Sequence, residues 1–174
     1  GAAGAYNIFA NFPNAARTDT WYPGALANKL SGSVLAADPD PFVNADIISF
    51  FNGNLGNPGC LEGVTFYLGL DGAASADQID LLTTALHEFG HGLGFQTFTS
   101  NQTGEQEVPD LTLPNGYPSI WDYFLFDTAQ RKVWAAMTNA ERATSAITPR
   151  NLVWNGERVT RNAPRVLDRG VAEL

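Results

Sequence analysis

Apolar residues recur at helical spacing along residues 76–93. The apolar positions of this segment follow one another at intervals of three and four: Ile79, Leu82, Leu86, Phe89 and Leu93. Such a period places them on one stripe of an α-helix. Ser75 and Gln78 stand at capping-box spacing before the segment, and Gly94 after it is a typical helix stop. The pattern therefore predicts a helix over residues 76–93 whose apolar stripe makes it mostly buried.

Three other segments predict strands. Apolar, largely β-branched and aromatic residues dominate 45–51 and 64–70, and a Gly-containing turn sequence follows each run, as is typical of strands. Residues 152–160 predict a hairpin, because Asn155-Gly156 is a strong turn pair.

Two short helices are predicted besides the long one. Residues 25–30 form a short helical segment, and residues 138–147 begin with a capping box formed by Thr138 and Glu141. Together the segments predict an α+β fold with a small mixed sheet. The chain has 174 residues, of which 44% are hydrophobic. That suits one globular domain over residues 1–174 with its own core.

Charge and apolar run length exclude two classes of function. Eighteen acidic residues against ten basic ones give a net charge of −8, which argues against a nucleic-acid surface. The longest apolar runs are far shorter than the roughly 20 residues of a membrane span. The chain begins Gly-Ala-Ala-Gly-Ala without an initiator Met. It is therefore expected to be a processed form or a fragment of a longer protein.

The chemistry-bearing motif lies inside the predicted helix. His87-Glu88-Phe89-Gly90-His91 is an H-E-x-x-H pattern, and its two histidines are the only ones in the chain. Histidines at i and i+4 leave one helix face a turn apart and hold one Zn²⁺ at about 2.0–2.1 Å each. Glu88 points to the side of the metal, where it serves as general base. The alternative interpretation is a surface helix with solvated side chains.

The motif and its continuation resemble a known protease group. The stretch from His87 to Gly94 is similar to the metzincin pattern H-E-x-x-H-x-x-G-x-x-H, and Gly94 matches its glycine. The third-ligand position of that pattern falls on Thr97, where metzincins carry His or, in some bacterial members, Asp. A neutral threonine hydroxyl is a poor zinc ligand.

A narrower set of proteins shares longer stretches with the chain. LHEFGHGLGFQTF, PSIWDYFLFD and MTNAERATSAI resemble segments of secreted bacterial metallopeptidases, which carry further sequence upstream and often a protease-associated domain downstream. The resemblance implies a metzincin-like zinc endopeptidase that acts outside the cell on peptides or proteins.

The third zinc ligand is predicted to be Asp122. It lies in Ser119–Tyr123, a segment similar to the Ser-Ile-Met-x-Tyr turn beneath the metzincin zinc, and carboxylate oxygen is ordinary zinc chemistry. Asp127 is the second candidate, while Glu105 and Glu107 are weaker ones. The alternative interpretation makes both aspartates capping or turn residues.

Cys60 supports two minor hypotheses. Gly59-Cys60-Leu61-Glu62 faintly resembles the cysteine-ligand segment of peptide deformylases, which would make the chain a small-amide hydrolase. An odd cysteine in a secreted protein also suggests a disulfide partner in a missing upstream segment, or else a buried free thiol. A further hypothesis is a module that binds metal or has a structural role without catalysis.

Overall fold

The chain folds into two compact units. The computed structural model describes residues 2–4, 7–36, 44–107 and 116–165. Unit 1 comprises Gly1–Asn14 and Pro23–Phe95, and unit 2 comprises Ala15–Tyr22 and Gln96–Leu174. Within the described residues the secondary structure is four α-helices, three short 3-10 helices and small sheets, so the predicted α+β class is confirmed. No helix in the described part of the chain is both long and apolar enough to cross a bilayer.

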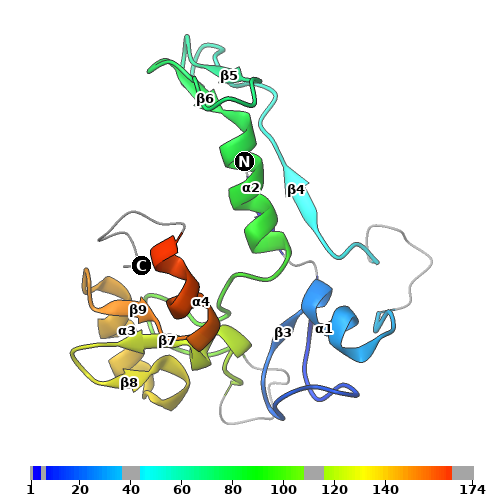
Figure 1. Cartoon of the computed structure of the whole chain (residues 1–174), viewed down its shortest axis with the longest axis vertical. Coiled ribbons are helices and arrows are strands. Elements are labelled where there is room, and N and C mark those ends of the chain that lie inside the picture. Colours follow the sequence, from blue (N-terminus) through cyan, green and yellow to red (C-terminus); the bar gives the residue numbers. More distant parts are fainter. Residues whose placement is uncertain (1, 5–6, 37–43, 108–115, 166–174) are drawn as a thin grey trace. The chain divides into compact units, whose positions relative to one another are not determined.

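Unit 1 is built around the motif helix. Its elements are β1 (Ala2–Gly4), β2 (Ile8–Phe9), α1 (Gly24–Ser31), β4 (Ile48–Phe50), β5 (Thr65–Tyr67), β6 (Gln78–Asp80) and α2 (Leu81–Gly92). β3 (Tyr22–Pro23) lies where the chain passes from unit 2 to unit 1. β1 pairs antiparallel with β4, and β5 pairs parallel with β6. α2 packs against β1 and β4, and Figure 1 shows β4 running beside it.

α2 begins later than its periodicity predicts. The Asp80 side chain caps the helix by accepting a hydrogen bond from the Thr83 N–H at 2.8 Å. Ser75 and Gln78 do interact, since the Ser75 N–H donates to Gln78 Oε1 at 3.2 Å. That contact closes a turn instead of a helix, because residues 78–80 pair with β5 as the strand β6. The predicted helix start was wrong because strand pairing overrode the local capping signal.

The prediction that the apolar stripe of α2 is buried was also wrong. Its three members within α2 are exposed, Leu82 at 39%, Leu86 at 63% and Phe89 at 45%, and so is Leu93 at the helix C-cap, at 61%. The buried residues of α2 are Glu88 and Gly92 instead. A Cβ at Gly92 would lie 2.2 Å from Ile47 Cγ2. The absence of a side chain at Gly92 therefore lets Ile47, just before β4, pack directly on the helix backbone.

Unit 2 contains a three-stranded antiparallel sheet with short helices. Its elements are η1 (Ile120–Tyr123), β7 (Leu125–Asp127), β8 (Lys132–Val133), η2 (Trp134–Ala136), α3 (Asn139–Ile147), β9 (Leu152–Trp154), α4 (Glu157–Asn162) and η3 (Ala163–Arg165). The strand order is β8-β7-β9. The core of the unit includes Trp134, whose indole Nε1–H donates to Ser145 Oγ of α3 at 2.9 Å.

Of the two segments predicted in unit 2, the helix at 138–147 is present and the hairpin at 152–160 is not. α3 forms as expected, and both hydrogen bonds of the Thr138–Glu141 capping box are present. The hairpin predicted at 152–160 does not form. β9 pairs with β7, and Gly156 is the N-cap of α4. The Asn155 N–H donates to the Phe124 carbonyl at 3.0 Å, so the turn pair leads into a helix instead of a second strand.

Candidate metal centre

The two histidines of the motif converge on one point. His87 and His91 leave α2 with their Nε2 atoms 3.1 Å apart and their ring planes at 86°. Two nitrogens that ligate one tetrahedral zinc at about 2.0–2.1 Å lie about 3.3 Å apart. The spacing of the pair therefore fits a shared metal ion. His87 is exposed and His91 is half-buried, so solvent can reach this point.

The backbone beyond the helix orients one of the two rings. His91 Nδ1 lies 2.9 Å from the carbonyl oxygen of Phe95. A carbonyl only accepts, so Nδ1 is the donor in this contact, and in the neutral ring Nε2 then presents a lone pair. Metal-ligating histidines usually have such a partner on the second nitrogen. Sequence reasoning missed the role of Phe95, for which the helix stop at Gly94 was the available signal.

Glu88 flanks the histidine pair from a buried position. It is 7% exposed. By helix geometry its side chain leaves α2 about 60° from His91 and about 100° from His87. Within the described residues no hydrogen bond or ion pair holds its carboxylate. Its oxygens are not among the fully buried side-chain atoms that lack a partner, so the carboxylate keeps contact with solvent beside the histidine pair.

Asp122 has its own set of partners inside unit 2. Its side chain is fully buried; Oδ1 accepts from Thr97 Oγ1 at 2.5 Å, and Oδ2 accepts from Thr99 Oγ1 at 3.0 Å and from the Ser119 N–H at 2.9 Å. Burial raises the pKa of Asp122, and the hydrogen bonds from Thr97, Ser119 and Thr99 oppose that rise. Asp122 is thus a capping residue of η1. That it also ligates zinc stays a prediction.

The other predicted ligands also have local partners. Asp127 is 1% exposed and accepts from the N–H groups of Ala129 and Gln130 at 2.9 and 2.8 Å. The Sγ of Cys60 accepts from the Asn52 side-chain amide at 3.1 Å. Throughout the described ranges, no group of three or more His, Cys, Asp or Glu side chains is placed to hold a metal ion. The histidine pair therefore provides two protein ligands, where a catalytic zinc has three.

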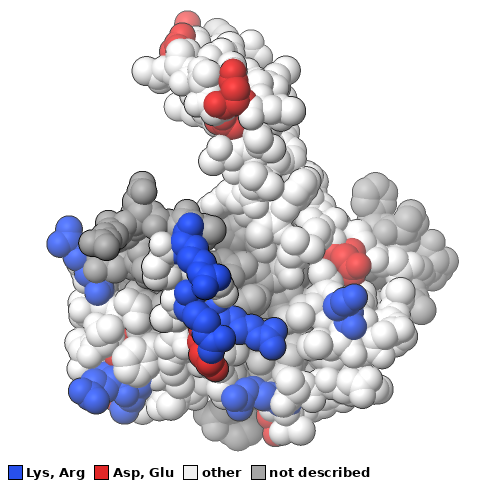
Figure 2. Space-filling model, in the orientation of Figure 1, with Lys and Arg blue, Asp and Glu red and all other residues white. Residues whose placement is uncertain are grey.

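The acidic end of unit 1 offers no competing centre. Figure 2 shows acidic side chains over the β5–β6 end of the unit. There the Tyr67 hydroxyl donates to Asp71 and lowers the pKa of that carboxyl, and Ser75 does the same for Asp77 at 2.5 Å. These carboxylates are paired with neighbouring hydroxyl groups and are not gathered around one point.

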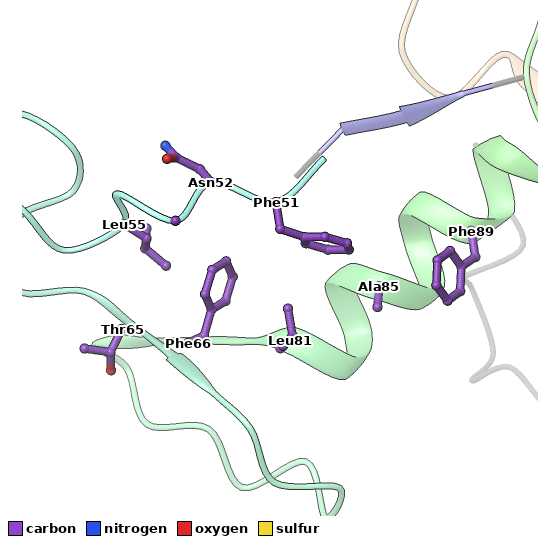
Figure 3. Close-up of a pocket in the computed structure, with 9 residues that line it drawn as sticks. Phe51, Asn52, Leu55, Thr65, Phe66, Leu81, Ala85 and Phe89 are labelled. Atoms are coloured by element: carbon purple, nitrogen blue, oxygen red, sulfur yellow. The ribbon is translucent and has the colours of Figure 1, made fainter. Parts of the chain in front are cut away.

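An apolar pocket lies on a different side of α2. Its volume is about 460 Å³, and its lining residues come from β5, α2 and the segment after β4 (Figure 3): Phe51, Asn52, Gly53, Leu55, Thr65, Phe66, Leu81, Ala85 and Phe89. Phe89 follows His87 by two residues, which corresponds to about 200° around the helix. The pocket and the histidine pair are therefore separate features of unit 1.

No match to the chain was found among protein-family models, curated proteins or solved structures. What the centre can do is therefore inferred from its own residues.

Proposed function

We propose that the chain is a zinc-dependent endopeptidase, with His87 and His91 as metal ligands and Glu88 as the proton-transferring residue. The observation that carries the proposal is the 3.1 Å approach of the two Nε2 atoms. When bound, Zn²⁺ acidifies a water molecule and polarises the substrate carbonyl. Peptide or protein substrates and a secreted, extracellular location belong to the same proposal, because they follow from the resemblance to secreted metallopeptidases.

Glu88 supplies the acid–base chemistry in this proposal. Its carboxylate takes a proton from the attacking water and passes it to the leaving amine nitrogen. The buried position of the side chain on the face next to His91 supports this role, because limited access to water strengthens the effect of its charge. His87, which is exposed, leaves the approach to the centre open.

The decisive experiment measures zinc in the full chain. We expect about one bound zinc per chain, and less than one-tenth of that in His87→Ala or His91→Ala, because each variant loses one ligand and the chelate geometry. Leu86→Ala is the matched control, since Leu86 precedes the motif on the same helix and is exposed. Hydrolysis of an unstructured protein substrate should vanish with the zinc. Full zinc content in either histidine variant would refute the proposal.

A metal-binding module without catalysis is the second candidate. It is favoured by the absence of a third ligand beside the histidines within the described residues. Wild-type protein that binds zinc stoichiometrically but cleaves no protein or peptide would support it. The minor deformylase hypothesis needs Cys60 at the metal, and a panel of formylated and unmodified peptides would test it.

A further inference from the structure

The end of α2 is closed by a hydrogen-bonded turn that involves the motif itself. The Gly94 N–H donates to the His91 carbonyl, and the Phe95 N–H donates to the Gly90 carbonyl, both at 2.9 Å. This is the pair of bonds that defines a Schellman motif. Gly94 has a φ of +113°, which a residue with a side chain rarely adopts.

The same turn directs a carbonyl group at a metal-binding histidine. Because the Phe95 N–H is tied to Gly90, the Phe95 carbonyl is held on the next turn of the chain, 2.9 Å from His91 Nδ1. The His91 ring is thus positioned by the backbone at the end of its own helix. His87 has no such backbone partner in the described part of the chain.

We propose that the Gly94–Phe95 turn is a positioning device that gives the two histidines opposite tautomers before metal binds, with His91 protonated on Nδ1 and His87 protonated on Nε2. Without a metal ion between them, two facing lone pairs 3.1 Å apart would repel, so in the metal-free pair of neutral rings one Nε2 donates to the other. The His91 proton is on Nδ1, where it meets the Phe95 carbonyl. His87 Nε2–H is therefore the donor, and His91 Nε2 accepts.

This asymmetry has a consequence for metal binding, which rests on the proposed function. His91 presents its Nε2 lone pair without any rearrangement. His87 must lose the Nε2 proton to solvent and take one from solvent on Nδ1, so that no net proton is exchanged. The turn therefore makes His91 the preformed ligand and His87 the adapting one.

Gly94 is the residue through which the device can be tested. A Cβ at this position would lie 2.9 Å from both Cβ and Cγ of Pro23, and the positive φ adds backbone strain. Gly94→Ala should therefore displace the turn and the Phe95 carbonyl. Gly32 is a matched control, because it ends α1 at a φ of +74° and has nothing within 4 Å of its Cβ position.

The first measurement is a long-range ¹H–¹⁵N correlation spectrum of the ¹⁵N-labelled, chelator-treated full chain at about pH 8, where free imidazole is neutral. We expect one Nδ1–H and one Nε2–H imidazole. His87→Ala leaves a single histidine and so assigns the Nδ1–H form to His91. An Nε2–H form of His91 in the wild-type chain would overturn the proposal, whatever any variant does.

The second measurement compares the glycine variants. Gly94→Ala should shift His91 toward the Nε2–H form and weaken zinc binding about 10–100-fold, whereas Gly32→Ala should change neither. Unchanged His91 tautomer and zinc Kd in folded Gly94→Ala would refute the role of the turn. Since the tautomers are read without metal, a wild-type chain that binds no zinc would refute the proposed function and leave this inference standing.

Discussion

Glu88 is the only acidic residue of α2, and its burial sets it apart from the exposed side chains around it. Replacing it with the neutral Glu88→Gln keeps the size of the side chain and removes the base. We expect zinc content to stay at the wild-type level and peptide hydrolysis to fall at least about 100-fold, the usual contribution of a general base. Zinc content and initial rates are measured on the same preparation. Activity within a few-fold of the wild type would assign the base to another residue.

Asp122 and Asp127 form a natural pair for testing the third ligand. Both are almost fully buried and both accept backbone N–H groups, so loss of either carboxylate should destabilise unit 2. If Asp122 is also a ligand, Asp122→Ala should raise the zinc Kd at least about tenfold while Asp127→Ala leaves it unchanged. Titrations are scaled to the folded fraction. Equal Kd values would restrict Asp122 to its capping role and leave a site of two histidines and water.

At the scale of secondary-structure elements, the packing of α2 depends on Gly92, whose lack of a side chain lets Ile47 contact the helix backbone. A Cβ at Gly92 would lie 2.2 Å from Ile47 Cγ2, whereas nothing lies within 4 Å of a Cβ at Gly90. Gly92→Ala should therefore lower the free energy of unfolding by about 1–3 kcal/mol through overpacking. Gly90→Ala should raise it by up to about 1 kcal/mol through helix propensity. Urea unfolding of the two variants checks the difference, and equal effects would contradict the packing of α2 on Ile47.

The strands flanking α2 explain why the helix begins at Leu81. β6 runs directly into the helix, and Asp80 is both its last residue and the helix N-cap. Thr65, Phe66 and Tyr67 of β5 pair with the three residues of β6. The residues expected from periodicity to form the first helical turn thus pair with β5 as a parallel strand, and the half of the helix that carries His87 and His91 is unaffected.

At the scale of the whole molecule, the proposed function predicts that zinc stabilises the fold, because the proposed histidine site is assembled only in the folded chain. A free zinc concentration of 100 times Kd adds about 2.7 kcal/mol to the free energy of unfolding. For a chain of this length that corresponds to a rise in Tm of roughly 5–10 °C. Differential scanning calorimetry with zinc and with chelator measures it, with His91→Ala as the control. An equal rise in His91→Ala would mean that zinc binds elsewhere.

Local sequence determined those features whose hydrogen bonds join near neighbours. The capping box of α3 links residues three apart, and the stop at Gly94 depends on its own positive φ. The i,i+4 spacing of His87 and His91 likewise follows from the helix period, and their Nε2 atoms meet as that spacing predicts. Each of these was predicted correctly because its energy is set within one or two turns of chain.

Tertiary contacts decided the features that depend on distant segments. The pairing of β6 with β5 made α2 shorter than predicted. The contact of Ile47 with Gly92 buries a helix face other than the apolar stripe. The pairing of β9 with β7 took the place of the expected hairpin. The hydroxyl groups that donate to Asp122 come from Thr97 and Thr99, which lie more than 20 residues before it in the chain. Periodicity and turn pairs carry no information about which remote residue will compete for a backbone N–H, a helix face or a carboxylate, and only the folded chain resolves that competition.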